Sequence, residues 1–357
     1  TGSFAVAQAG NDLQLVYSPG GPTNDIIIDV PSGTETQAQA GYPTIATADS
    51  VTKVGLGVLV FDAANAYTGP TTISAGTLQV ANANGLGATS VTVDTGATLA
   101  IATGTTMKSP SVIVDGGTLS GAALAVNNTT GITSLAINAG TIAGSPLVTI
   151  TTGGEMSLVQ DARVTVAIGG LSVDQANGGG RLDVGAGAVA IAAGGISAAD
   201  LRADIIAGRN TGAWNGTAGI TSSAAAASGG TRAVGYVVAG SGAATVSFAA
   251  PGDVDLSGTV NVFDLVGINS SGTYGTGAAS VWSTGDFNYD NVTNVFDLVS
   301  INTAAAYGQG NYFPAAPSAS GLGSVAAVPE PATWLLAACG LGGLATARRL
   351  VRRSRRS

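Results

Sequence analysis

A motif of about 20 residues recurs through the first two hundred residues and constrains the fold more than any other feature. Its template is Ser-φ-x-φ-[Asp/Asn]-x-Gly-x-φ, where φ is apolar, and its clearest copies lie at 90–99, 111–119 and 134–142. Apolar residues alternate with polar ones within each copy, which is the period of a β-strand. Because one such unit is too small to bury its apolar face, neighbouring units must stack.

Stacked units form the coils of a right-handed parallel β-helix, so we expect a mainly β fold with a solenoid over 1–195. Looser copies of the motif lie at 147–156 and 171–182. The residues expected to close successive coils are Leu78, Leu99, Leu119, Ile142, Met156 and Leu182, spaced 21, 20, 23, 14 and 26 residues apart. We interpret the last two spacings together as two ordinary periods. The alternative, an antiparallel sandwich, requires hairpin turns, and only 83–87 resembles one.

The segment 67–101, YTGPTTISAGTLQVANANGLGATSVTVDTGATLAI, resembles the autotransporter-associated β-strand repeat of bacterial surface proteins. The resemblance implies a passenger-type β-helix at the cell surface and no particular chemistry.

Charge and composition exclude some classes of function. Six of the 13 basic residues lie at 348–356, so the remainder carries seven basic and 21 acidic residues, a net charge of −14. A body this acidic argues against nucleic acid as a partner. The absence of His excludes Ser-His and Cys-His nucleophiles. The chain begins at Thr1 without a signal peptide, and we interpret it as a mature product or a C-terminal fragment.

Some parallel β-helices cleave polysaccharides, which requires clustered carboxylates, or a base with Ca²⁺. The candidate cluster here is Glu155, Asp161, Arg163, Arg181 and Asp183. These residues fall on neighbouring expected coils and could converge, but we favour the interpretation that they are solvated outward positions or salt bridges. A cap is expected over 196–250, with a helix at 196–208 and a hairpin at 231–253 that cover the open end of the solenoid.

Two acidic loops, offset by 33 residues, follow the cap. Positions 1, 3, 5, 7, 9 and 12 of the first loop are Asp253, Asp255, Ser257, Thr259, Asn261 and Asp264. The same positions of the second loop are Asp286, Asn288, Asp290, Val292, Asn294 and Asp297. These are EF-hand ligand offsets, with position 7 supplying its backbone carbonyl, and oxygen ligands in a flexible loop favour Ca²⁺ over Mg²⁺. We therefore expect two Ca²⁺ sites.

Position 6 of the loops is Gly258 in the first and Asn291 in the second, and both residue types tolerate the left-handed conformation. A helix is expected after each loop and none before it. The segment 251–310 contains two units, each a loop with Asp at position 12 followed by an expected helix. This arrangement resembles a type I dockerin module.

Dockerins bind cohesin domains partly through positions 10 and 11 of each loop, which are Val262-Phe263 and Val295-Phe296 here. Two interpretations of these apolar pairs remain open, docking on a partner or filling the module's own core. Because core filling is the commoner fate of such residues, we favour the core.

A linker at 311–327 leads to a C-terminal segment at 328–357. The apolar run 332–347, extended by the next few residues, is expected to form a transmembrane helix, with the following arginines in the cytoplasm. The segment contains a Pro-Glu-Pro tripeptide, then the apolar helix and then an arginine cluster. This order resembles the PEP-CTERM sorting signal. The residues that carry it are Pro329, Glu330, Pro331, Arg348, Arg349, Arg352 and Arg353. The resemblance implies an exosortase as partner and anchoring in the membrane at least before processing.

Together these features resemble large surface proteins of planctomycete-type bacteria. We expect a non-enzymatic structural or adhesive protein at the cell surface or in the extracellular matrix. The alternatives are a module that binds a cohesin-type partner and a polysaccharide-active β-helix.

Overall fold

The computed structural model describes residues 3–9, 12–18, 24–176 and 178–317. Strands β1 (Ser3–Ala9) and β2 (Asp12–Ser18) form an antiparallel hairpin. In the part of the chain that the structure describes, no helix is long and apolar enough to cross a membrane. The expected transmembrane helix and the seven sorting-signal residues lie outside the described residues.

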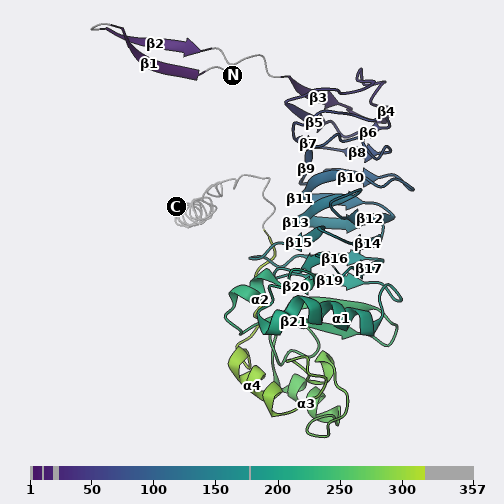
Figure 1. Cartoon of the computed structure of the whole chain (residues 1–357), viewed down its shortest axis with the longest axis vertical. Coiled ribbons are helices and arrows are strands. Elements are labelled where there is room, and N and C mark those ends of the chain that lie inside the picture. The colour runs from purple at the N-terminus through teal and green to yellow at the C-terminus, as the bar shows by residue number, and fades with distance from the viewer. Residues whose placement is uncertain (1–2, 10–11, 19–23, 177, 318–357) are drawn as a thin grey trace, which may run out of the picture. The chain divides into compact units, whose positions relative to one another are not determined.

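The first row of strands in the solenoid pairs in parallel from one coil to the next. In chain order it contains β3 (Asp25–Asp29), β5 (Ser50–Val54), β7 (Thr71–Ile73), β9 (Ser90–Asp94), the start of β11 (Ser109–Ser120) and of β13 (Ile132–Ala143), β15 (Glu155–Leu158), β18 (Arg181–Asp183) and β20 (Gly219–Thr221). In Figure 1 the labels β3, β5, β7, β9, β11, β13 and β15 follow this stack along the solenoid.

Two further rows complete the coils, also with parallel pairing. One contains β4 (Thr34–Thr36), β6 (Val58–Phe61), β8 (Thr77–Val80), β10 (Thr98–Ile101) and the ends of β11 and β13; the other contains β12 (Ala123–Val126), β14 (Leu147–Ile150) and β17 (Gly170–Val173). The expected mainly β fold, a parallel β-solenoid, is thereby confirmed, with about seven turns.

The expected row of coil-closing residues is confirmed in its first four members. Leu78, Leu99, Leu119 and Ile142 are direct partners from strand to strand and are all buried. Met156 and Leu182 are also buried, but they lie in the other row, where Met156 pairs with Leu135. The expectation of a single row was therefore wrong for these two residues. The spacing of 14 reflects a change of row, whereas the spacing of 26 is one coil within the new row, where Met156 pairs with Leu182.

The solenoid ends in a sheet whose pairing changes direction. Strand β16 (Thr165–Ile168) pairs in parallel with β19 (Ala188–Ile191), which pairs antiparallel with β22 (Ala244–Ala249). Strand β21 (Ala233–Val238) completes the expected hairpin with β22. An antiparallel hairpin satisfies the open edge that a further coil would otherwise pair with.

The helices are few and short. The expected cap helix is α1 (Ala198–Arg209), which begins at the N-cap Ser197, and a short turn η1 (Asn210–Gly212) and helix α2 (Ser223–Ala227) follow. Helices α3 (Val262–Ser270) and α4 (Val295–Ala304) follow the two loops, as expected, and only the 3₁₀ turn η2 (Trp282–Thr284) lies between them. In Figure 1, α3 and α4 lie beyond the cap end of the solenoid.

Candidate metal centre

The first loop gathers three carboxylates. One oxygen from each of Asp253, Asp255 and Asp264 lies within 4.8 Å of the others. Asp253 and Asp264 are buried, whereas Asp255 is exposed. Ser257 and Thr259 face each other across the loop, with 3.1 Å between their hydroxyl oxygens. The residues expected at five of the six ligand positions therefore lie in one compact oxygen-rich loop, which suits a hard cation.

Backbone amides hold the two ends of the first loop. Asp253 at position 1 accepts hydrogen bonds from the amides of Ser257 (3.0 Å) and Gly258 (2.8 Å). Asp264 at position 12 accepts from the amides of Val254 (3.1 Å) and Asn261 (2.9 Å).

The second loop repeats this arrangement. Asp286 accepts from the amide of Asn291 (3.0 Å), and Asp297 accepts from the amides of Phe287 (2.8 Å) and Asn294 (2.9 Å). Asp290 accepts from the Asn288 side-chain amide at 2.9 Å and from the Val292 backbone amide at 3.0 Å. Hydrogen bonds therefore connect all six expected ligand positions of the second loop within one compact loop.

The residues at positions 9 and 12 also cap the N-termini of the helices that follow. Asn261 and Asn294 are the N-caps of α3 and α4, and each accepts the amide of the Phe two residues on at 2.8 Å. Asp264 and Asp297 complete a capping box in each helix. The same residues that would bind a cation thus fix where each helix begins.

Position 6 is left-handed in both loops, as expected. Gly258 has a φ of 87° and Asn291 a φ of 74°. Position 4 is left-handed as well, with φ values of 59° at Leu256 and 62° at Tyr289.

Burial dominates the electrostatics of four of the loop carboxylates. It raises the pKa of Asp253 to about 6, although hydrogen bonds from Tyr312 and from the Gly258 amide act in the other direction. Burial also raises the pKa values of Asp264, Asp286 and Asp297 above their ordinary range. These four carboxylates therefore lie in positions that disfavour uncompensated negative charge, which a bound cation would relieve. Asp255 differs, because burial acts to raise its pKa but hydrogen bonds with Asp253 and Ser257 bring it below the ordinary value.

One atom in the second loop tests directly whether the residues there suit a bound cation. Asp286 is 1% exposed, and its Oδ1 is buried with no hydrogen-bond partner. A buried carboxylate oxygen of this kind is costly unless something pairs with it. The gathered carboxylates of the first loop therefore fit a hard cation, and in the second loop Asp286 Oδ1 provides an unpaired ligand atom.

Several residues that seat the loops were missed in the sequence. The Trp282 indole donates to the Asp253 carbonyl at 2.7 Å, and the Tyr312 hydroxyl donates to Asp253 Oδ2 at 2.6 Å. Arg202 of α1 donates to Asp286 Oδ2 at 2.9 Å. Tyr289 is buried and donates to the carbonyl of Val234 on β21. Each of these residues is distant in sequence from its partner, so no local pattern marked it.

The apolar pairs at positions 10 and 11 of the loops are exposed, and the expectation that they fill the module's core was wrong. Val262 is 53% and Phe263 80% exposed, and Val295 and Phe296 are 56% and 66% exposed. The reason is the orientation of α3 and α4, which turn Asp264 and Asp297 inward at 3% and 1% exposure. The neighbouring apolar residues consequently face outward.

The candidate catalytic cluster does not converge. Arg181 pairs with Glu155 at 2.6 Å. Asp183 instead accepts the amides of Gly185 and Ser223, and Arg163 donates to Ser247 and lies over the Phe313 ring. Asp161 lines a separate surface hollow with Val159 and Gln160. The five candidate residues are thus divided among separate structural contacts, and Asp183 is buried rather than solvated.

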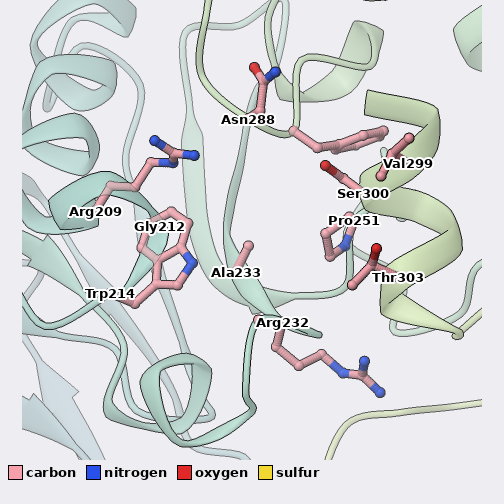
Figure 2. A pocket seen from close by; sticks show the side chains of 12 residues that line it. Arg209, Gly212, Trp214, Arg232, Ala233, Pro251, Asn288, Val299, Ser300 and Thr303 are labelled. Carbon is pink, nitrogen blue, oxygen red and sulfur yellow. The ribbon is translucent and has the colours of Figure 1, made fainter. Parts of the chain in front are cut away.

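A cavity of about 180 Å³ lies beside the second loop. Figure 2 shows Arg209 and Trp214 on one side of it and Ser300 and Thr303 of α4 on the other. Its lining includes a second arginine, Arg232, and no carboxylate. The lining of the cavity therefore contains no carboxylate that could pair with Arg209 or act with it in acid–base chemistry.

Comparison with protein families finds one match. Residues 51–80, which run from β5 to β8, match the Passenger-associated-transport-repeat. No curated protein and no solved structure matched the chain. The matched segment overlaps the one that resembles an autotransporter-associated repeat in sequence. The repeat and the β-solenoid together indicate a surface-exposed, autotransporter-like structural protein.

Proposed function

We propose that this chain is a non-enzymatic structural or adhesive protein of the bacterial cell surface, in which a β-solenoid stalk ends in a dockerin-like module stabilised by two Ca²⁺ ions. The observation that carries the calcium part is the repeated loop geometry. In both loops the position 1 carboxylate accepts the position 6 amide, and the position 12 carboxylate accepts the amides of positions 2 and 9.

The ligands would come from the side chains or, at position 7, the backbone of each loop. They are Asp253, Asp255, Ser257, Thr259, Asn261 and Asp264 for one ion and Asp286, Asn288, Asp290, Val292, Asn294 and Asp297 for the other. When bound, Ca²⁺ supplies positive charge to carboxylates that are otherwise buried in excess. Outside the cell, millimolar Ca²⁺ would fill even a weak site.

The role of the module is mechanical in this proposal. Its loops hold the starts of α3 and α4 through the capping boxes. Tyr289 attaches the module to the cap through the carbonyl of Val234 on β21, and the Trp282 indole links the segment between the loops to the first loop through the Asp253 carbonyl. Ca²⁺ binding would therefore stabilise the end of the solenoid, where the parallel stack stops.

Export and anchoring rest on the sequence after the module. The resemblance to a PEP-CTERM signal supports recognition by an exosortase, insertion of the C-terminal helix in the membrane and delivery to the surface. Cells that express the chain with and without residues 328–357 test this by fractionation. The intact chain is expected at the surface, and equal surface delivery of the shortened chain would contradict the proposal.

Equilibrium dialysis of the whole chain tests the calcium sites. We expect two Ca²⁺ per chain, and one after either Asp255→Ala or Asp290→Ala, since each removes an exposed ligand carboxylate from one loop. A stoichiometry of zero, or one that neither substitution lowers, would rule out the proposed sites.

A second candidate function is favoured by the exposed Val-Phe pairs. Apolar side chains at positions 10 and 11 of both loops offer a surface for a cohesin-type partner. A pull-down with cohesin domains tests this, and Val262→Asp with Phe263→Asp is expected to abolish capture. Absence of capture by the unmodified chain would leave the structural function as the better account.

A further inference from the structure

The two loops differ in what neutralises their first carboxylate. In the second loop, the Arg202 guanidinium forms an ion pair with Asp286, with Nη2 2.9 Å from Oδ2. The same Nη2 also donates to the carbonyl of Tyr289 at 3.2 Å. The arginine comes from α1, 84 residues earlier in the chain, and its side chain is 19% exposed.

In the first loop the equivalent carboxylate has only neutral donors among the described residues. Asp253 accepts from the amides of Ser257 and Gly258 and from the Tyr312 hydroxyl. Arg163 interacts electrostatically with Asp253, but its guanidinium donates to the carbonyls of Ala186 and Gly187 and to the Ser247 hydroxyl, and it lies over the Phe313 ring. Arg163 therefore forms no ion pair with the first loop.

The ion pair in the second loop leaves atoms unsatisfied on both sides. Arg202 Nε and Asp286 Oδ1 are each buried without a hydrogen-bond partner. Arg202 thus neutralises Asp286 through one oxygen and leaves the other free, which means that the carboxylate retains a site for a second positive group.

We propose that Arg202 is a built-in counter-ion of the second loop, which makes the second loop bind Ca²⁺ more weakly than the first and causes the two loops to fill in sequence. This inference rests on the proposed calcium function. Its physical basis is Coulombic, because a guanidinium remains charged at every physiological pH and repels a divalent cation bound to the same carboxylate.

The same contact has a benefit when Ca²⁺ is low. Because Arg202 is part of α1, its charge keeps the second loop formed and attached to the cap in the absence of the cation. The first loop has no such substitute, so its order depends more on the metal. The second loop would act as the permanent attachment and the first as the higher-affinity site.

Titration calorimetry of the whole chain with CaCl₂ tests the inference, with Asp255→Ala as background to silence the first loop. In that background, Arg202→Met is expected to raise the Ca²⁺ affinity of the second loop by about tenfold or more. Arg209→Met is the matched control, since Arg209 lies on the same helix and forms no hydrogen bond or ion pair with a loop carboxylate in the described chain. It is expected to leave the affinity unchanged.

A conservative variant separates charge from packing. Arg202→Lys retains the positive charge and is expected to keep the affinity within a few-fold of the parent, and it also serves if Arg202→Met fails to fold. Equal affinities of the two loops in the parent chain, or an unchanged second-loop affinity in Arg202→Met, would overturn the inference while leaving the calcium sites in place. Absence of Ca²⁺ binding by the parent chain would instead remove the proposed function itself, and this inference with it.

Discussion

Gly258 and Asn291 occupy the same position of the two loops and adopt the same left-handed conformation. Only glycine does so without cost, and Asn is among the few other residues that tolerate it. The sequence was sufficient to predict this, because the loop offsets identified position 6 and the residue types then fixed its backbone.

Substitutions at Asn291 should separate backbone conformation from side-chain chemistry. We expect Asn291→Ala to lower the free energy of unfolding by about 1 kcal/mol, whereas Asn291→Gly should leave it unchanged or raise it slightly. Urea unfolding in the presence of a chelator measures both without a contribution from the metal. Equal stability of the two variants would show that the left-handed backbone carries no strain there.

Asp204 provides a pH-dependent prediction away from the loops. It is 3% exposed, and burial raises its pKa to about 6, with Asp200 adding to the effect and a hydrogen bond from Gln175 opposing it. A carboxyl whose folded-state pKa exceeds its unfolded value of 3.8 favours folding fully below that value, and its contribution is lost as the pH rises towards about 6.

Asp204→Asn should remove this dependence. Relative to the parent chain, the variant is expected to gain about 1 to 3 kcal/mol between pH 4 and pH 7. Chemical unfolding at several pH values in this range measures the difference. If the stability difference between the two chains does not change with pH, the ionised form of Asp204 is not penalised by burial.

At the scale of elements, the repeat predicted the strands and their stacking, and the sequence also led us to expect helices at the places of α1, α3 and α4. The errors came from tertiary context. A strict spacing rule assigned Met156 to the row of Leu119, although its strand joins the other row. The Val-Phe pairs were expected inside because they are apolar, but short helices that turn a capping Asp inward have no room for a second buried face.

Lys53 is a structural element of the solenoid that no pattern indicated. It is fully buried on β5, and its Nζ donates to the carbonyls of Val54 and Gly55, both at 2.7 Å, and of Ala75 at 3.2 Å. Three acceptors satisfy the three N–H groups of an ammonium. The side chain therefore connects one coil to the next through polar contacts.

Lys53→Met should destabilise the solenoid by about 1 to 3 kcal/mol, because it leaves these carbonyls without their donor. Lys108→Met is the matched control, since Lys108 is exposed, and it should change the stability little. Denaturant midpoints of the two variants measure the difference. Similar midpoints would mean that Lys53 contributes no more than a surface lysine.

At the scale of the whole molecule, the described chain is a β-solenoid whose last coils lead into a cap and then into two acidic loops seated on that cap. The attachment depends on Arg202 and Tyr289, which connect the second loop to α1 and β21. Trp282 links the segment between the loops to the first loop through the Asp253 carbonyl. The sequence predicted the order of these parts, but it could not predict their contacts, because each contact joins residues without a shared local pattern.

The most direct test of the account is differential scanning calorimetry of the whole chain with a chelator and with millimolar CaCl₂. Since a ligand at 100 times its dissociation constant stabilises by about 2.7 kcal/mol per site, we expect Ca²⁺ to raise the unfolding temperature by about 5 °C or more. The rise should be largely lost in the chain that carries both Asp255→Ala and Asp290→Ala. An unfolding temperature that is the same with chelator and with Ca²⁺ would contradict the claim that calcium stabilises this module.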